Sequence, residues 1–222
     1  MVRIEGRETD AATATTTDAV STAGQGWAKR RYKLRTAATA APSDEVERHN
    51  LRFGLRELIA YHAMREQALA RLNRFLTGLQ VFLGTSAIAL MTNMLPINPA
   101  WLVVASALAG VVLLVVDPAG GARDHRALRS RYHNLLADVE ECDGSAEELR
   151  SLRAKKERAN ADSPPSYRGV QAIAFNAAVN ATYSEAEASE YRYAVGFWRR
   201  VFANWFPMRG FQFKMERPTP LK

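Results

Sequence analysis

The residue types that bind metal ions are few in this chain and poorly spaced for that task. The four histidines are His49, His62, His125 and His133, and no two of them stand four residues apart, as a metal-binding pair on one helix requires. The single cysteine, Cys142, can neither add a second thiolate nor form an internal disulfide. The sequence therefore predicts no metal site.

Motifs for nucleotide binding and for nucleophilic catalysis are also missing. The chain has no GxxxxGK[ST] loop, no GxGxxG turn and no GxSxG elbow, and no strand pattern that would support one. We expect no catalytic residues, no cofactor and no enzymatic activity.

Two histidines share a local pattern. His62 follows Tyr61 and His133 follows Tyr132, in two segments that we predict to be helical. A contact between these histidines could sense pH. The alternative is that both are tolerated at partly exposed positions on a helix seam.

The longest apolar segment runs from Phe75 to Val116, 42 residues without Asp, Glu, Lys or Arg. About 20 apolar residues cross a bilayer, so this length predicts two spans, at about 75–95 and 101–116, joined by a turn at 96–99. The alternative, a hairpin inside a soluble protein, would require burial on every side.

Polar and small residues inside the two spans are candidate functional positions, because such residues face protein or water rather than lipid. The candidate pore-lining residues are Thr77, Gln80, Gly84 and Thr85. The candidate helix-contact residues are Ala105, Ser106, Ala109 and Gly110. Contacts within the hairpin, contacts between protomers and a pore lining all remain open.

Helices are predicted on both sides of the hairpin. A stripe with steps of four and three precedes it, at Leu51, Leu55, Leu58, His62, Arg65, Leu69, Leu72 and Leu76, and a matching stripe follows it, at Leu128, Tyr132, Leu135, Val139 and Cys142. These two stripes should pack together. Ser145 with Glu148 predicts a capping box for a helix to about 160, and Ser163 with two prolines predicts another through about 190.

The predicted fold is therefore all-α and membrane-integral, a two-span transmembrane hairpin continuous with a cytoplasmic helical bundle. We divide the chain into an Ala/Thr-rich, basic, disordered tail at 1–43, the hairpin and bundle at 44–190, and a basic aromatic tail at 191–222. Arginines flank both spans and the turn has no charge, which predicts two cytoplasmic termini. The flanking arginines are Arg56, Arg65, Arg71, Arg74, Arg123, Arg126, Arg129 and Arg131.

Aromatic and basic residues alternate after Tyr191, where seven Lys or Arg residues face one acid. This pattern is typical of a membrane-interface segment. One alternative is that these side chains pack within the chain itself. Single-stranded nucleic acid could also stack on them, although we do not expect a nucleic-acid partner in an anchored protein. The candidate membrane-interface residues are Trp198, Arg199, Arg200, Trp205 and Phe206.

Segments 44–181 together resemble the SLATT family, two-transmembrane effector domains associated with bacterial nucleotide signalling. The resemblance is carried by AYHAMREQALARLNRF from Ala60, MLPINPAW from Met94, ARDHRALRSRYHNLLADVE from Ala122 and NADSPPSYRGVQAIAFNAAVN from Asn160. It implies a homo-oligomeric effector that permeabilises the bacterial inner membrane in a conflict or anti-phage system. It implies no catalytic residues.

Three function classes follow: a pore-forming effector, a membrane-tethered helical scaffold without pore activity, and a holin-like phage protein. Holins usually have smaller soluble parts, which counts against the third. Membrane lipid is the expected partner in each class, and the bundle could receive a signal from an upstream protein or a second messenger.

Overall fold

The computed structural model describes residues 44–84 and 98–215 of the chain. Within these residues every regular element is a helix, so the all-α prediction is confirmed for this part of the chain. The predicted tail at 1–43, the candidate Thr85 and most of the predicted turn lie outside the described residues.

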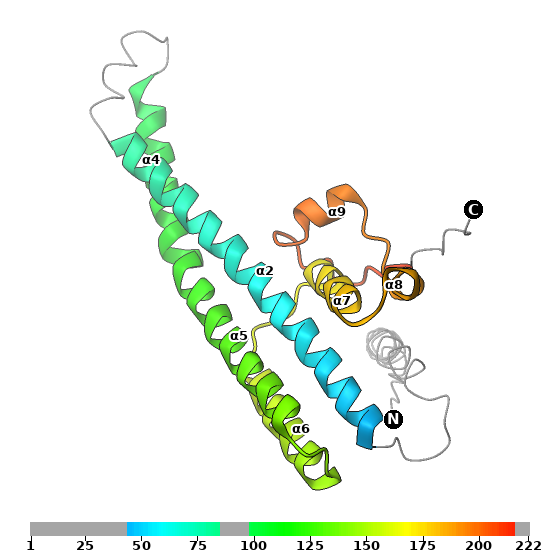
Figure 1. The fold of residues 1–222 in the computed structure, drawn as a ribbon. Coiled ribbons are helices and arrows are strands. Elements are labelled where there is room, and N and C mark those ends of the chain that lie inside the picture. Colours follow the sequence, from blue (N-terminus) through cyan, green and yellow to red (C-terminus); the bar gives the residue numbers. More distant parts are fainter. Residues whose placement is uncertain (1–43, 85–97, 216–222) are drawn as a thin grey trace, which may run out of the picture. The chain divides into compact units, whose positions relative to one another are not determined.

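The longest helix, α2 (Asp44–Gly84), packs against α4 (Pro99–Val116), α5 (Pro118–Glu141), α6 (Ala146–Ala161) and α7 (Arg168–Thr182). Asp44, Glu45 and Glu47 lie in its first turn, where negative charge favours the positive end of the helix dipole. The helix continues without a break past Phe75, as the sequence predicted, so one rigid element joins the bundle to the apolar segment (Figure 1).

Helices α4 (Pro99–Val116) and α5 (Pro118–Glu141) follow each other with one residue between them. That residue, Asp117, has a left-handed backbone (φ 39°), and its carboxylate accepts a hydrogen bond from the Gly120 N–H at 2.9 Å. Pro118 fits the first turn of α5 because its missing N–H is not needed there. The apolar helix thus ends at Asp117, where the sequence predicted it would.

The main core lies between α2, α5 and α6 (Ala146–Ala161). It confirms that the two predicted stripes pack together, because Leu51 and Leu55 of α2 lie in one cluster with Leu128, Tyr132 and Val139 of α5. Helix α6 closes the cluster; its buried residues are Leu149, Leu152 and Ala159.

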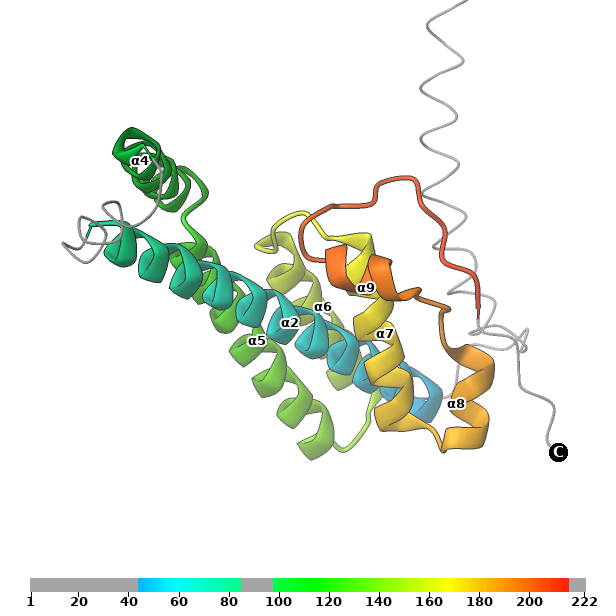
Figure 2. The ribbon, with the colours of Figure 1, turned by 90° about the horizontal axis from the view of Figure 1, so that it is seen from above.

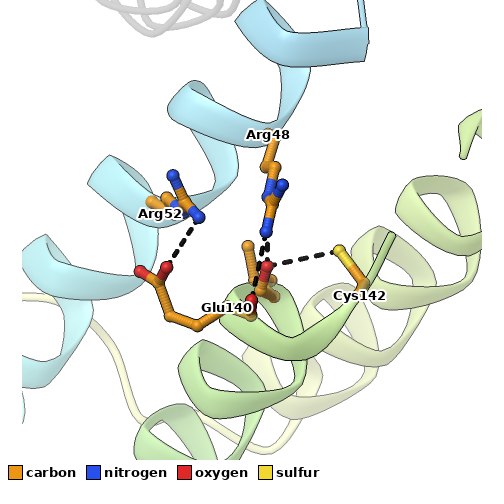
Figure 3. A network of polar contacts seen from close by, with 5 residues as sticks. Arg48, Arg52, Glu140 and Cys142 are labelled. Atoms are coloured by element: carbon orange, nitrogen blue, oxygen red, sulfur yellow. Dashed lines mark hydrogen bonds and ion pairs between the residues drawn. The ribbon is translucent and has the colours of Figure 1, made fainter. Parts of the chain in front are cut away.

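At the end of this core, two arginines of α2 reach the last turn of α5 (Figure 3). The Arg48 guanidinium donates to the carbonyl oxygens of Val139 at 3.3 Å and Glu140 at 3.1 Å. Arg52 pairs with the Glu140 carboxylate at 2.6 Å, and the Cys142 thiol donates to the Val139 carbonyl at 3.2 Å. The final carbonyls of a helix have no partner of their own, so these arginines complete the end of α5.

Helix α7 (Arg168–Thr182) packs on α2, and α8 (Glu185–Tyr191) and α9 (Phe197–Phe202) pack on α7 (Figure 2). The single helix predicted from Ser163 to about 190 is therefore wrong. The chain remains extended until Tyr167, whose N–H donates to the Tyr61 hydroxyl at 3.1 Å, and it breaks again at Ser184, which starts α8 with a capping box.

Candidate functional site: the apolar hairpin and the histidine layer

The outer surface of the hairpin is apolar and uncovered. The helical stretch Ala100–Glu141 is long and apolar enough to cross a membrane. Only 6% of its most apolar segment of 18 residues is buried. Trp101 is 70% exposed and Leu114 is 83% exposed. On α2, Phe75, Val81 and Phe82 are exposed as well. Exposed apolar area of this extent requires a partner other than water.

The inner face of the hairpin contains the predicted small residues of α4. Ala109 is buried, and Ala105, Ser106 and Gly110 are half-buried. A Cβ atom built on Gly110 would lie 3.2 Å from Nε2 of Gln80 on α2. The small face therefore lets the two helices of a single chain approach closely, which is one of the uses that the sequence left open.

Only part of the predicted polar set can be placed. Thr77 and Gln80 both lie on the exposed surface of α2, and the Gln80 amide is directed at Gly110. Gly84 is the last residue of α2, and Thr85 lies outside the described residues. The structure thus brings Gln80 and Gly110 together, and among the residues that it describes it gives Thr77 no polar contact that would assign it a role.

Next to the hairpin, the bundle contains a polar cluster that we call the histidine layer: His62, Arg65 and Glu66 of α2 with His125, Arg126 and Arg129 of α5. The Nδ1 atoms of His62 and His125 are 2.8 Å apart. One nitrogen must donate and the other must accept, so the neutral pair shares a single proton across this contact. Both rings are buried, and the His62 ring also lies against Tyr132, 5.3 Å between centroids.

The environment of this pair disfavours positive charge. Burial, reinforced by the neighbouring His125, lowers the pKa of His62 from 6.5 to about 4. Burial also lowers the pKa of His125 to about 4, helped by the nearby Arg65 charge and opposed by Asp124 and Glu66. The two histidines are therefore neutral at pH 7.

Two charged residues of α2 connect the histidine layer to other helices. The buried Glu66 carboxylate pairs with Arg126 at 2.8 Å and with Arg129 at 3.1 Å. The buried Arg65 donates to the Asn204 carbonyl at 2.7 Å and lies over the Tyr167 ring at 3.9 Å. Glu66 thus joins α2 to α5, and Arg65 joins α2 to the chain after α9. Removal of Arg126 and Arg129 would leave the buried Glu66 carboxylate unpaired.

The first of the two alternatives for these histidines, a contact between His62 and His133, is wrong, because His62 pairs with His125 instead. His133 is exposed on α5, and His62 is fully buried rather than partly exposed. Its partner, His125, lies three residues before Leu128, so it continues the four-and-three spacing of the predicted stripe. Extending that stripe one step further back gives Gly121, where a Cβ atom would lie 3.1 Å from Leu69.

The predicted interface residues lie on and just after α9. Trp198, Arg199, Arg200, Trp205 and Phe206 are all exposed. The rest of the basic aromatic tail is different. Phe213 is buried, and Tyr191 and Tyr193 pack against the α7 and α8 cluster, so the structure separates an exposed segment from an internal one.

Within the described residues, no group of three or more His, Cys, Asp and Glu side chains could hold a metal ion. No family model, curated protein or solved structure matches the chain. Its function is therefore argued from the hairpin, the histidine layer and the surface itself.

Proposed function

We propose that the chain is an integral protein of the bacterial inner membrane, and that its apolar hairpin crosses the bilayer twice. The observation that carries this proposal is the uncovered apolar surface of α4, with Leu114 83% exposed and Val115 76% exposed. A bilayer would cover this surface, whereas a core helix of a soluble protein would be covered by its own chain.

The charges next to the hairpin support a topology with both termini in the cytoplasm. Arg71 and Arg74 are exposed on α2 just before the apolar segment, and Arg123 and Arg126 are exposed on α5 just after it. Positive residues are retained on the cytoplasmic side of spans. In this orientation the histidine layer and the helical bundle are cytoplasmic.

We propose further that the protein acts as an oligomeric effector that permeabilises this membrane in a bacterial conflict or anti-phage system, as the resemblance to the SLATT family implies. The polar residues Thr77 and Gln80 support this function, because polar side chains in a span face water or protein. The bundle would receive the triggering signal, from an upstream protein or a second messenger, and transmit it through the continuous helix α2.

One observation favours a second candidate function, a membrane-tethered scaffold. Gln80 contacts Gly110 within the same chain, so the small face of α4 is already used by the hairpin. A hairpin whose small face already packs against its own chain needs no second copy at that face. In that case the bundle itself, held near the bilayer, is the functional part.

Membrane potential separates these candidates. We expect induced wild-type protein to depolarise the bacterial inner membrane, measured with a potential-sensitive dye and with its genetic neighbours present. Gly110→Leu should abolish the signal, because it adds bulk where Gln80 already lies close. Ala107→Leu on the exposed face of the same helix is the matched control and should leave the signal intact.

A second pair of variants tests conduction. Gln80→Leu should reduce depolarisation with less effect on crosslinked oligomers, and Val81→Leu at the next, exposed position should not change it. If the wild-type protein inserts but leaves the potential unchanged even when the neighbouring system is activated, the pore is refuted and the scaffold stands.

A further inference from the structure

An aromatic surface on and just after α9 has no partner among the described residues. Six large apolar side chains are exposed there, with Phe197 71% exposed and Trp198 69% exposed. The six residues are Phe197, Trp198, Val201, Phe202, Trp205 and Phe206. We call this set the α9 patch. Contiguous exposed aromatic area is a feature of interaction sites.

The opposite side of this segment is fixed firmly to the bundle. Ala203 is fully buried, and a Cβ atom on Gly169 of α7 would lie 3.0 Å from the Ala203 Cβ, so glycine at 169 lets the two segments approach closely. The next residue, Asn204, accepts a hydrogen bond from the buried Arg65 at 2.7 Å. The α9 patch is therefore held in place and directed outward, rather than exposed because the chain is loose.

The charge around the patch selects an anionic partner. Between Tyr191 and Met215 there are five basic residues and no acidic residue. Arg199, Arg200 and Arg209 are exposed, and the Arg199 guanidinium lies 4.0 Å from the Phe211 ring centroid. Aromatic side chains interleaved with arginine are typical of segments that lie in the headgroup region of a membrane.

The place along α2 at which the α9 patch is anchored indicates which membrane surface the patch can reach. Its anchor, Arg65, precedes Phe75 by ten residues on one continuous helix, which corresponds to about 15 Å along the axis. We propose that the α9 patch docks on the anionic headgroups of the same leaflet that α2 enters, and that it forms a second, peripheral membrane contact. This inference rests on the proposed two-span hairpin.

The ring geometry fits a lipid surface better than single-stranded nucleic acid. Phe197 contacts Trp198, Trp198 contacts Phe202, and Phe202 contacts Phe206, with centroids 5.4, 6.2 and 6.1 Å apart. The rings thus contact one another in a row and form one continuous exposed surface. Base stacking instead needs separate, open ring faces along a basic groove.

Lipid quenching of tryptophan emission in the full chain tests this proposal. The protein is reconstituted into vesicles that contain brominated lipid, with or without about a third of anionic phosphatidylglycerol, a content at which each basic residue near the surface contributes about fivefold to binding. One variant keeps only Trp198 and Trp205 (Trp27→Phe with Trp101→Phe), and a second keeps only Trp101. We expect strong quenching of the first variant in anionic vesicles and weaker quenching in zwitterionic vesicles or at high salt.

Charge reversal provides the matched comparison. Arg200→Glu with Arg209→Glu should lower the docking equilibrium by at least about tenfold. Arg150→Glu with Arg158→Glu, an exposed pair on α6, should leave quenching unchanged. Equal quenching in anionic and zwitterionic vesicles, or no effect of reversal at Arg200 and Arg209, would overturn the proposal.

The remaining outcomes are also decisive. The Trp101 variant reports hairpin insertion independently, so quenched Trp101 with unquenched Trp198 and Trp205 refutes docking while the spanning hairpin stands. Unquenched Trp101 refutes the hairpin itself. Protection of Trp198 from lipid quenching by a single-stranded oligonucleotide would assign the α9 patch to nucleic acid instead. A crosslink between the patch and a second copy would assign it to that copy.

Discussion

The buried histidine pair makes the stability of the bundle dependent on pH in a defined direction. The pKa of both imidazoles is about 4 in the folded chain against 6.5 for an ordinary histidine. Between these values the unfolded chain binds more protons than the folded chain, so the free energy of unfolding falls as the pH falls from 6.5 to 4. Above pH 6.5 both rings are neutral in both states, and this contribution is constant.

The size of the effect follows from the same values. A pKa that falls from 6.5 to about 4 makes each protonation roughly 3 kcal/mol more costly in the folded chain. In the neutral pair, one Nδ1 donates its proton to the other Nδ1 at 2.8 Å. Protonation of the accepting nitrogen therefore also breaks this hydrogen bond. Between pH 7.5 and 4.5 the two rings together should lose about 5 kcal/mol, so we expect Tm to fall by roughly 10–20 °C.

Thermal unfolding in detergent, followed by the helical circular dichroism signal, measures this fall. Acid also acts on the rest of the chain, so the test is a comparison of variants. His62→Leu with His125→Leu removes both partners and should flatten the pH dependence, whereas His133→Leu, at the exposed histidine of α5, should behave as wild type. If the double variant loses as much Tm as the wild type on acidification, the reasoning is refuted.

Three substitutions test the packing of the bundle by changes in Tm. Arg48→Ala removes two hydrogen bonds to the last carbonyls of α5 and should cost about 1–2 kcal/mol; no measurable change would mean that water replaces them. Tyr132→Phe removes the hydroxyl that donates to Asn160 at 2.9 Å and should cost about 1 kcal/mol, which an unchanged Tm would contradict. Leu55→Ala, at a side chain only 1% exposed, should cost about 2–5 kcal/mol, and the exposed Val46→Ala is its control; equal effects of the two would place Leu55 outside the core.

Much of the bundle could be predicted because its determinants are local. The four-and-three spacing predicted both seam helices, and the charge at Asp117 with the proline after it predicted the end of α4. The predicted capping box at Ser145 forms only in part. The Ser145 hydroxyl accepts a hydrogen bond from the Glu148 N–H at 3.4 Å, but the Glu148 carboxylate accepts from the Asp143 N–H rather than from the Ser145 N–H.

The error in the helix after Ser163 had a visible local signal. Ser184 and Glu187 stand three residues apart, which is the spacing of a capping box, and both hydrogen bonds of that box form at the start of α8. The two prolines do not start a helix, because Tyr167 after them is held extended by a hydrogen bond to a distant partner, the Tyr61 hydroxyl.

The histidine layer and the anchoring of α9 could not be predicted to the same degree. Pairing of His62 with His125 depends on the register between antiparallel helices 63 residues apart, although the extended stripe at least places His125 on the seam. Ala203 contacts Gly169, and Arg65 contacts Asn204. No periodic pattern in the sequence links the two residues of either pair. Such contacts arise from tertiary packing alone.

We propose that the hairpin crosses the membrane and returns both ends of the chain to the cytoplasm. Cysteine labelling in intact bacterial cells tests it most directly, because Cys142 is the single native cysteine and can be replaced by alanine. In that background we introduce Ala100→Cys at the start of α4 or Ser166→Cys before α7, both at exposed positions. A membrane-impermeant maleimide should label Ala100→Cys in intact cells and Ser166→Cys only after the membrane is opened. Labelling of Ser166→Cys in intact cells, or of Ala100→Cys only after lysis, would contradict the account.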